Sequence, residues 1–377
     1  MRIGIVTGEY PPMQGGVGAY SSIIAGKLCD LGHEVRLFSR EGTKSQNIPL
    51  MTHKGRWGRS AMRKIHAWAQ AEALDLINLQ FQTAAFGMSA HVHYLPGFVA
   101  PVPIVTTFHD LRYPYLFPKA GRLRPWIVQR LAKNSAGVIV TNQADYEQVK
   151  YLPYSTLIPI GSNILTDLPA NYDRDAWRKQ SGAQAKHYLI AHFGFVNHSK
   201  GVDTLLRALA ILRAAGVPAK LVMVGGRTGS SDKSNVAYAK EIDHQISLLG
   251  LDEHVLWTGY VSSEEVTAYL NAADVVTLPF RDGASFRRGS LMAAIQHACP
   301  IITTTPTTKI PAFTDTMQFV PPDDSPLLAE ALQALYDDPA RRDALRQRVR
   351  ELHALFDWDS IAHKCADFYQ RVVSVAP

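Results

Sequence analysis

The residues best suited to chemistry lie in two loops in the second half of this chain. Lys200 follows Gly194 and stands directly before a segment with helical apolar periodicity. Asp282 opens the second loop, which continues with Arg287 and Arg288. A Lys ammonium at a helix start suits a diphosphate, and an Arg guanidinium can hold two phosphate oxygens at once. We therefore expect Lys200 and one or both arginines to bind phosphate, and the Asp282 carboxylate to bind sugar hydroxyls.

The backbone of the second loop is expected to bind as well. Glycine and other small residues let backbone N–H groups approach a ligand closely. We expect the N–H groups of Gly283, Ala284 and Ser285 to bind sugar hydroxyls or phosphate, with Ser290 close by at the start of the next predicted helix. The simpler alternative for this loop, as for Lys200, is a solvated basic surface.

The first half of the chain has a comparable loop at residues 9–18 (EYPPMQGGVG). Gly15 and Gly16 follow an apolar strand and precede a helix that starts near Val17. The unpaired N–H groups of a helix start attract phosphate, although a tight turn without a ligand is the alternative. The loop does not read GxGxxG, and no acidic residue is placed to bind an NAD ribose. A hydride-transfer enzyme is therefore disfavoured.

A histidine is the other candidate in the first half. His109 stands at the carboxyl end of an apolar strand, the edge at which parallel sheets bind their ligands. We therefore expect His109 to contact a substrate, with a structural role as the alternative. His91 and His93 show no comparable pattern and are not assigned a function.

These candidates require a scaffold of parallel strands. Short, nearly continuous apolar segments alternate with helical ones, and the pattern restarts after residue 163. Such alternation is typical of a parallel sheet covered on both faces. We expect an α/β fold with two Rossmann-like domains facing each other across a cleft, residues 1–165 and residues 166–355. A helix at about 356–377 follows, with an Asp or Ser at its start expected as the cap. We expect Asp357-Trp358-Asp359 to begin this helix rather than to bind metal as a D-x-D.

Composition narrows the class of protein. The chain of 377 residues has a net charge of +6, and residues 1–163 alone carry +8, concentrated at 54–64 and 119–133. Aromatic residues interleave with this charge. A solvated face and contact with an anionic membrane or a phosphate-bearing lipid are the two interpretations, while nucleic acid is disfavoured because no binding module is visible.

The compartment follows from what the sequence lacks. Three distant cysteines form no CxxC pair, no apolar run is long enough to span a membrane, and the chain opens on a strand that the fold needs. We expect a cytoplasmic location, with peripheral contact at the inner face of the membrane as a further hypothesis.

Motifs throughout the chain resemble family 4 glycosyltransferases, which have the GT-B fold. The resemblance rests on their order and spacing: the opening YPP…GGVG…Y, then GHEVRLFSR, FHD, IPIGSN, GFVNHSKGVDTLLRAL, LVMVGG, VLWTGYVSSEEVTAYLNAADVVTLPF and FDWDSIAHKCADFY. It implies a retaining, metal-independent hexosyltransferase that uses a nucleotide-diphosphate sugar and no other cofactor. The acceptor would be a lipid-linked saccharide or a cell-surface polysaccharide precursor.

The resemblance also implies roles for parts of the chain. The donor would bind the C-terminal domain and the acceptor the N-terminal domain, which the last helix would cross back to complete. Gly16 would face the donor phosphates, His109 the transferred sugar and Lys200 the diphosphate. Gly259 and Tyr260, within VLWTGYV, would lie at the nucleotide.

Two departures from the family pattern affect the donor site. Phe195 stands where the family usually has an Arg after Gly194. We hypothesise that Arg287 or Arg288 supplies the missing guanidinium.

The other departure is in the E-x7-E element of the family. Asp282 replaces its first Glu, and the second Glu, which would bind the donor ribose, falls on Ser290 by spacing or on Ala293 by helix alignment. This loss keeps open a non-catalytic protein that binds nucleotide sugars or serves as a scaffold. A nucleotide-sugar epimerase is a further alternative, but it would need several carboxylates, and these are scarce here.

Overall fold

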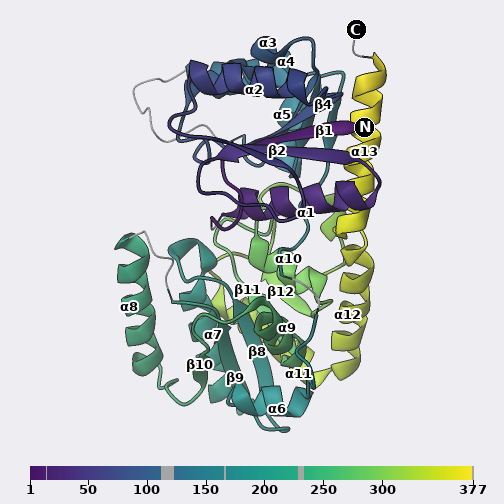
Figure 1. Ribbon diagram of the computed structural model, residues 1–377. Helices are drawn as coiled ribbons and strands as arrows, with labels where there is room; N and C mark the ends of the chain where they lie inside the picture. The colour runs from purple at the N-terminus through teal and green to yellow at the C-terminus, as the bar shows by residue number, and fades with distance from the viewer. Residues whose placement is uncertain (14, 112–122, 165–166, 228–232, 376–377) are drawn as a thin grey trace. The chain divides into compact units, whose positions relative to one another are not determined.

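The computed structural model describes residues 1–13, 15–111, 123–164, 167–227 and 233–375, which form two compact units. Unit 1 comprises Met1–Gly161 together with Asp357–Pro377, and unit 2 comprises Ser162–Phe356 (Figure 1). The sequence predicted the first boundary at residue 165 and the final helix from about 356.

Unit 1 is built on a parallel sheet of seven strands in the order β3-β2-β1-β4-β5-β6-β7. In chain order the strands are β1 (Arg2–Thr7), β2 (Glu34–Arg40), β3 (Leu50–His53), β4 (Leu76–Phe81), β5 (Ile104–Phe108), β6 (Gly137–Val140) and β7 (Ser155–Leu157). The helices are α1 (Gly16–Asp30), α2 (Arg59–Ala71), η1 (Ala90–Tyr94), α3 (Leu95–Val99), α4 (Leu123–Asn134), α5 (Gln143–Val149) and α13 (Trp358–Val375). Buried apolar residues dominate the central strands, as both faces of the sheet are covered.

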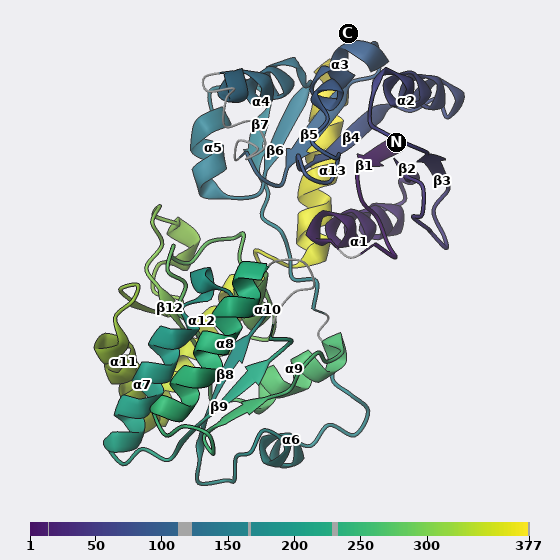
Figure 2. The ribbon, with the colours of Figure 1, turned by 90° about the vertical axis from the view of Figure 1, so that its left-hand side faces the viewer.

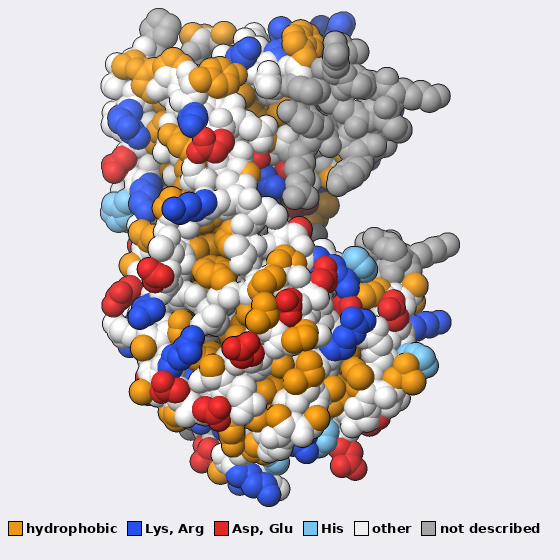
Figure 3. Space-filling model, turned by 180° about the vertical axis from the view of Figure 1, so that it is seen from behind, with side chains coloured by type: hydrophobic (Ala, Val, Ile, Leu, Met, Phe, Trp, Pro, Cys, Tyr) orange, Lys and Arg blue, Asp and Glu red, His pale blue; other side chains and the backbone are white. Residues whose placement is uncertain are grey.

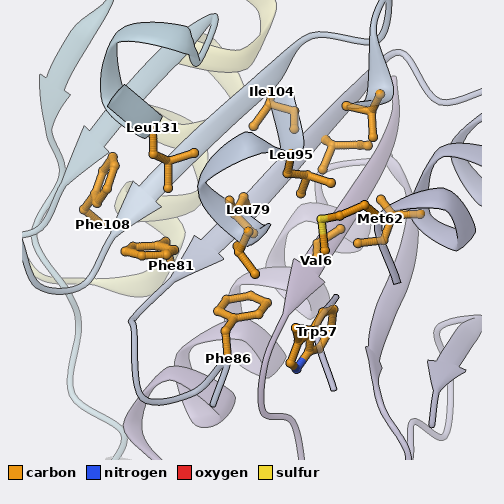
Figure 4. Packing of buried hydrophobic residues seen from close by; sticks show 14 of the residues in the cluster. Val6, Trp57, Met62, Leu79, Phe81, Phe86, Leu95, Ile104, Phe108 and Leu131 are labelled. Atoms are coloured by element: carbon orange, nitrogen blue, oxygen red, sulfur yellow. The ribbon is translucent and has the colours of Figure 1, made fainter. Parts of the chain in front are cut away.

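The two faces of this sheet belong to two hydrophobic clusters. Helices α1 and α13 cover one face, and α2, α3, α4 and α5 cover the other (Figure 2). Figure 4 shows the second cluster, in which the Trp57 ring packs against Phe86 with 4.8 Å between ring centroids. The sequence suggested that Trp57 interleaves with the surface charge of residues 54–64. Trp57 instead belongs to the core.

Unit 2 repeats this architecture with six parallel strands in the order β10-β9-β8-β11-β12-β13. The strands are β8 (Tyr188–Phe193), β9 (Ala219–Val224), β10 (Val255–Trp257), β11 (Val275–Leu278), β12 (Ile301–Thr304) and β13 (Gln318–Val320). The helices are α6 (Arg174–Gln180), η3 (His198–Lys200), α7 (Val202–Ala214), α8 (Lys233–Leu248), α9 (Ser263–Ala272), α10 (Gly289–Gln296), η4 (Pro311–Phe313), α11 (Ser325–Asp337) and α12 (Pro339–His353).

The start of α13 confirms the predicted cap. An Asp357 carboxylate oxygen accepts a hydrogen bond from the Ser360 N–H at 3.0 Å, which satisfies a backbone donor of the first turn. Asp357 therefore begins a helix, and the metal-binding alternative is not supported.

Candidate functional site

The candidate site of unit 2 lies where its sheet changes the direction of its connections. Strands β8 and β11 are neighbours, but β9 and β10 follow on one side of them and β12 and β13 on the other. In open α/β sheets the crevice at the carboxyl ends of such a strand pair binds the ligand. The two loops singled out from the sequence, after β8 and after β11, both start at this edge.

Glycines allow the loop after β8 to pack closely against the segment after β11. Gly194 and Gly201 have φ of 120° and 61°, a region that side chains rarely adopt. A Cβ on Gly201 would lie 2.1 Å from the Pro279 carbonyl oxygen. This close approach holds Lys200, the neighbour of Gly201, at the end of β11.

Lys200 and Arg288 lie against the same aromatic ring. The Lys200 ammonium is 5.0 Å from the centroid of Phe280, and the Arg288 guanidinium carbon is 4.7 Å from it. Lys200 Nζ also donates to Ser290 Oγ at 2.9 Å, and Arg288 Nη1 donates to Ser199 Oγ at 3.3 Å. The structure thus brings Lys200 from the first loop together with Arg288 and Ser290 from the second.

The electrostatics of this cluster favour an anion. Burial, followed by the nearby Arg288 cation, lowers the pKa of Lys200 to about 8. Helix α10 begins beside these cations with neither a side-chain cap nor an acidic residue in its first turn. Two adjacent cations at a helix N-terminus would be relieved of mutual repulsion by a bound phosphate group.

Arg281 fixes the loop that carries Lys200, a role that the sequence did not reveal. Its guanidinium donates to the Asp203 carboxylate at 2.7 Å and to the His198 carbonyl at 2.9 Å. Asp203 also accepts a hydrogen bond from the Tyr238 hydroxyl at 2.7 Å. These partners come from three separate segments, so local sequence patterns carry no signal for them.

The backbone groups expected to bind a ligand in the second loop are engaged within the protein. The Gly283 N–H donates to the Phe280 carbonyl at 3.2 Å, and the Ala284 N–H donates to the Thr304 carbonyl at 3.1 Å. Ala284 is also buried. Gly283 and Ala284 therefore do not offer the free N–H groups that were expected. Among the described residues, the Ser285 N–H makes no such bond, and the Ser285 carbonyl accepts from the Arg288 N–H.

The side chains of the altered E-x7-E element also differ in whether a ligand could reach them. Asp282 is half exposed and forms an ion pair with Arg288. Ser290 faces Lys200, whereas Ala293 is fully buried and so lies out of reach of a ligand. Of the two arginines considered for the missing guanidinium, Arg288 is the one that lies beside Lys200.

Gly194 connects these residues to the predicted nucleotide contacts. A Cβ on Gly225, at the end of β9, would lie 3.6 Å from Gly194, and Gly225 pairs with Gly259 in a short antiparallel bridge. Tyr260, next in the chain, is 83% exposed. Gly259 and Tyr260 thus belong to the same sheet edge as the cation cluster, and Phe195 is likewise exposed there.

In unit 1, the N-terminus of α1 already holds an anion supplied by the chain. Glu9 Oε1 accepts hydrogen bonds from the N–H groups of Val17 and Gly18, each at 3.1 Å. A Cβ on Gly15 would lie 2.3 Å from the same oxygen, whereas space is open around Gly16. The expectation that the Val17 N–H is free for a phosphate is therefore not met.

His109 lies at the predicted carboxyl edge of the sheet in unit 1. Its N–H donates to the Phe81 carbonyl at 3.0 Å, and its ring packs edge-on against Tyr20 with 4.7 Å between centroids. Burial lowers the pKa of the imidazole to about 4, so the ring is neutral at physiological pH. His109 Nε2 lies 2.8 Å from Gln80 Oε1, a partner that the sequence had not indicated.

Among the residues that the structure describes, no group of three or more His, Cys, Asp or Glu side chains is arranged to hold a metal ion. Within the same ranges, no helix has both the length and the apolar character needed to cross a bilayer. On the face drawn in Figure 3, cationic and anionic side chains are interspersed.

Comparisons with known proteins agree with this architecture. The family model described as Glycosyltransferase Family 4 matches residues 14–161, and the one described as Glycosyl transferases group 1 matches residues 187–338. Each match lies within one unit. The two matches together span most of both sheets.

Individual relatives are similar over nearly the whole chain. A D-inositol 3-phosphate glycosyltransferase of Kineococcus radiotolerans is 26% identical, over 95% of this chain and 91% of that protein. A GDP-mannose-dependent monoacylated alpha-(1-6)-phosphatidylinositol monomannoside mannosyltransferase of Corynebacterium glutamicum is 24% identical, over 97% of each. The structure of Anabaena HepE (Alr3699) in complex with UDP has a TM-score of 0.79 at 20% identity, covering 98% of this chain and 100% of that one. From these matches and the two parallel-sheet units, this chain belongs to the family 4 glycosyltransferases of the GT-B fold.

Proposed function

We propose that this protein is a retaining glycosyltransferase that moves a hexosyl group from a nucleotide-diphosphate sugar to a hydroxyl of a saccharide or lipid-linked acceptor. The observation that carries the proposal is the cation cluster of unit 2. Lys200 and Arg288 share the Phe280 ring and lie beside the uncapped start of α10, at the edge of the sheet where ligands bind. A diphosphate matches this arrangement in charge.

We assign the donor to unit 2 and the acceptor to unit 1. The assignment of the donor to unit 2 is supported by the cation cluster, and a nucleotide-diphosphate donor is supported by the UDP bound to the similar HepE protein. The proposal of a lipid-linked acceptor is supported by the similar mannosyltransferase, whose name specifies a phosphatidylinositol glycoside. Because one of these two names specifies UDP and the other GDP-mannose, the base preferred by this chain is left for experiment.

The proposed chemistry needs no nucleophile from the protein. The bond between the sugar C1 and the phosphate oxygen breaks, the bond from C1 to the acceptor oxygen forms on the same face, and the acceptor proton passes to the departing diphosphate. Charge builds up on that diphosphate, and we propose that Lys200, Arg288 and the α10 N–H groups stabilise it with no metal ion. Removing one such donor typically lowers the rate by about 10²–10³.

We also propose that unit 1 contacts an anionic membrane surface. Helix α2 buries Met62, Ile65 and Trp68 and exposes Arg59 and Arg63 on its other side. Such a cationic face attracts anionic lipids. This contact would bring the enzyme to a lipid-linked acceptor.

A thermal-shift screen tests the donor proposal. The full chain is heated with UDP, GDP, ADP, TDP or CDP and with their common sugar conjugates, in the presence and absence of EDTA. We expect one base to stabilise the protein regardless of EDTA, by about 2.7 kcal/mol at a ligand concentration about 100 times Kd. Lys200→Met and Arg288→Met should abolish the shift, while Lys240→Met, at an exposed position of α8, should keep it.

The same protein preparations separate the remaining alternatives. Binding that disappears in EDTA would contradict metal independence. Binding without sugar transfer to any acceptor would favour the non-catalytic binding or scaffold function, for which Ser290 in place of a carboxylate is the motivating observation. Conversion of the donor sugar into its epimer would favour the epimerase. If no nucleotide shifts the unfolding temperature, the donor site itself is contradicted.

A further inference from the structure

A row of buried polar side chains lies on one face of the sheet in unit 1. Asn78 and Gln80 lie on β4 and are 0% and 1% exposed. Because side chains two apart on a strand share a face, both lie on the side of Leu76, which packs in the cluster of α1 and α13. Burying an amide is costly unless its polar atoms are hydrogen-bonded, so the partners of these two amides matter.

The partners form a continuous chain that ends at His109. Asn78 Nδ2 donates to the Val105 carbonyl oxygen at 3.1 Å and to Thr107 Oγ1 at 2.9 Å. Gln80 Nε2 donates in turn to Asn78 Oδ1. At the other end of the chain, Gln80 Oε1 lies 2.8 Å from His109 Nε2.

The direction of every bond in this chain follows from its first acceptor. A backbone carbonyl can only accept, so Asn78 must turn its NH₂ group toward Val105 and its oxygen toward Gln80. That oxygen requires a donor, which fixes the NH₂ group of Gln80 beside it and leaves the Gln80 oxygen facing the imidazole. This oxygen has no hydrogen to give, so His109 Nε2 must carry the proton.

The other imidazole nitrogen is thereby defined as well. In a neutral ring with a proton on Nε2, Nδ1 has a lone pair and accepts hydrogen bonds. Within the described part of the chain, Nδ1 makes no hydrogen bond, and His109 as a residue is partly exposed at the carboxyl edge of the sheet. A substrate group that meets Nδ1 must therefore be a donor, which a sugar hydroxyl is and a phosphate oxygen is not.

We propose that Gln80 and Asn78 are positioning residues that hold His109 as its Nε2–H tautomer, so that Nδ1 accepts a hydrogen bond from a hydroxyl of the substrate sugar. The assignment to a sugar rests on the function proposed above, whereas the tautomer is a property of the protein alone. The device selects for a hydroxyl over an acceptor-only group of the same size at that position of the substrate.

The tautomer can be measured without substrate. The full chain is labelled with ¹⁵N-histidine, and long-range ¹H–¹⁵N spectra are recorded at neutral pH, where the protonated and unprotonated ring nitrogens of a neutral histidine resonate far apart. His109→Asn identifies the signals of His109 among the 14 histidines. We expect His109 to be almost entirely the Nε2–H tautomer in the unaltered protein.

Variants of the row test the cause. Gln80→Met keeps the side-chain length but removes both hydrogen bonds, so the two tautomers of His109 should become mixed. Asn78→Leu removes the anchor on Val105, which frees the Gln80 amide to turn over, so it should also mix them. Gln82→Met is the control, because the Gln82 amide oxygen accepts only from the Ala85 N–H among the described residues.

The outcomes distinguish this inference from the proposed function. A mixture or the Nδ1–H tautomer in the unaltered protein overturns the inference, even if Gln80→Met fails to fold, and so does a Gln80→Met spectrum identical to that of the parent. In a protein that transfers sugar, Gln80→Met should lower kcat/KM by about tenfold, the worth of one hydrogen bond, with the nucleotide-induced thermal shift unchanged. If the tautomer is as expected but no nucleotide binds and no sugar is transferred, the proposed function is contradicted. The assignment of the Nδ1 partner to a sugar is then lost as well, but the inferred tautomer stands.

Discussion

At the scale of single residues, the charge of Lys200 lowers the stability of the free protein, and the same charge is proposed to bind the donor. Burial and the Arg288 cation lower its pKa to about 8 in the folded chain, whereas an unfolded Lys titrates near ~10.4. Between these values the unfolded chain binds more protons than the folded one, so stability rises with pH across this window. Below about pH 8 the charged Lys200 destabilises the fold by a constant amount.

Replacing this charge should therefore stabilise the free protein while removing its ligand binding. Lys200→Met is expected to raise the free energy of unfolding at pH 7 by about 1–2 kcal/mol, less than the full pKa shift implies because the side chain is partly exposed and its bond to Ser290 is lost. The gain should shrink toward pH 10, where the parent Lys200 is itself neutral. Calorimetry from pH 6 to 10 measures it, with Lys240→Met as the control.

Two results would contradict this account of Lys200. A variant less stable than the parent at pH 7 would mean that the ammonium is a net stabilising contact in the free protein. A gain of stability that is the same at pH 7 and pH 10 would mean that packing of the methionine, rather than loss of charge, is responsible.

At the scale of elements, the two helix starts that the sequence predicted as phosphate sites differ in one respect. Among the described residues, the first turn of α10 has neither a side-chain cap nor an acidic residue, whereas two N–H groups of α1 donate to Glu9. A glycine turn before a helix was visible in the sequence at both places. The return of Glu9 onto the helix that follows it depends on the path of residues 9–16, which no local periodicity specifies.

Local periodicity in the sequence also decides which elements could be predicted and which could not. Central strands such as β4 and β11 were predictable because burial on both faces requires continuous apolar residues. Strand β3 has no comparable signal in the sequence because it lies at the sheet edge, with Met51 and Thr52 exposed and no apolar run to mark it. Likewise, Gln80 reads as an ordinary polar residue until β5 places His109 beside it.

The exposed cations of helix α2 are proposed to contact an anionic membrane. Arg59→Gln with Arg63→Gln removes two exposed cations and leaves the buried face of the helix intact. Binding to vesicles that contain anionic lipid should weaken by roughly tenfold or more, since each such cation contributes about 1 kcal/mol near the surface. Vesicle sedimentation measures this, and added salt should weaken binding of the parent.

The matched control for α2 changes two exposed cations of unit 2. Lys179→Gln with Lys240→Gln alters the net charge equally but leaves unit 1 unchanged. If both pairs weaken binding by the same factor, overall charge rather than α2 is responsible. Equal binding of the parent to neutral and anionic vesicles would contradict the electrostatic contact altogether.

At the scale of the whole molecule, the chain closes unit 1 with its last helix. Ile361, Cys365 and Tyr369 of α13 are buried with α1 and the strands in one hydrophobic cluster. One hydrophobic cluster of unit 2 is made of residues between Tyr188 and Leu345. Because each cluster buries its own apolar surface, we expect the two units to respond separately to the loss of a core side chain.

Two matched truncations test this separation in the full chain. Ile361→Ala in α13 and Leu332→Ala in α11 each remove a fully buried aliphatic side chain, which typically costs about 2–5 kcal/mol. Hydrogen exchange should then speed up at the protected amides of β1 and β4 for Ile361→Ala, and of β8 and β9 for Leu332→Ala, with the other unit unchanged. Faster exchange in both units from either change would mean that the chain unfolds as one cooperative body, in which case α13 would stabilise the donor unit as well as the sheet that it covers.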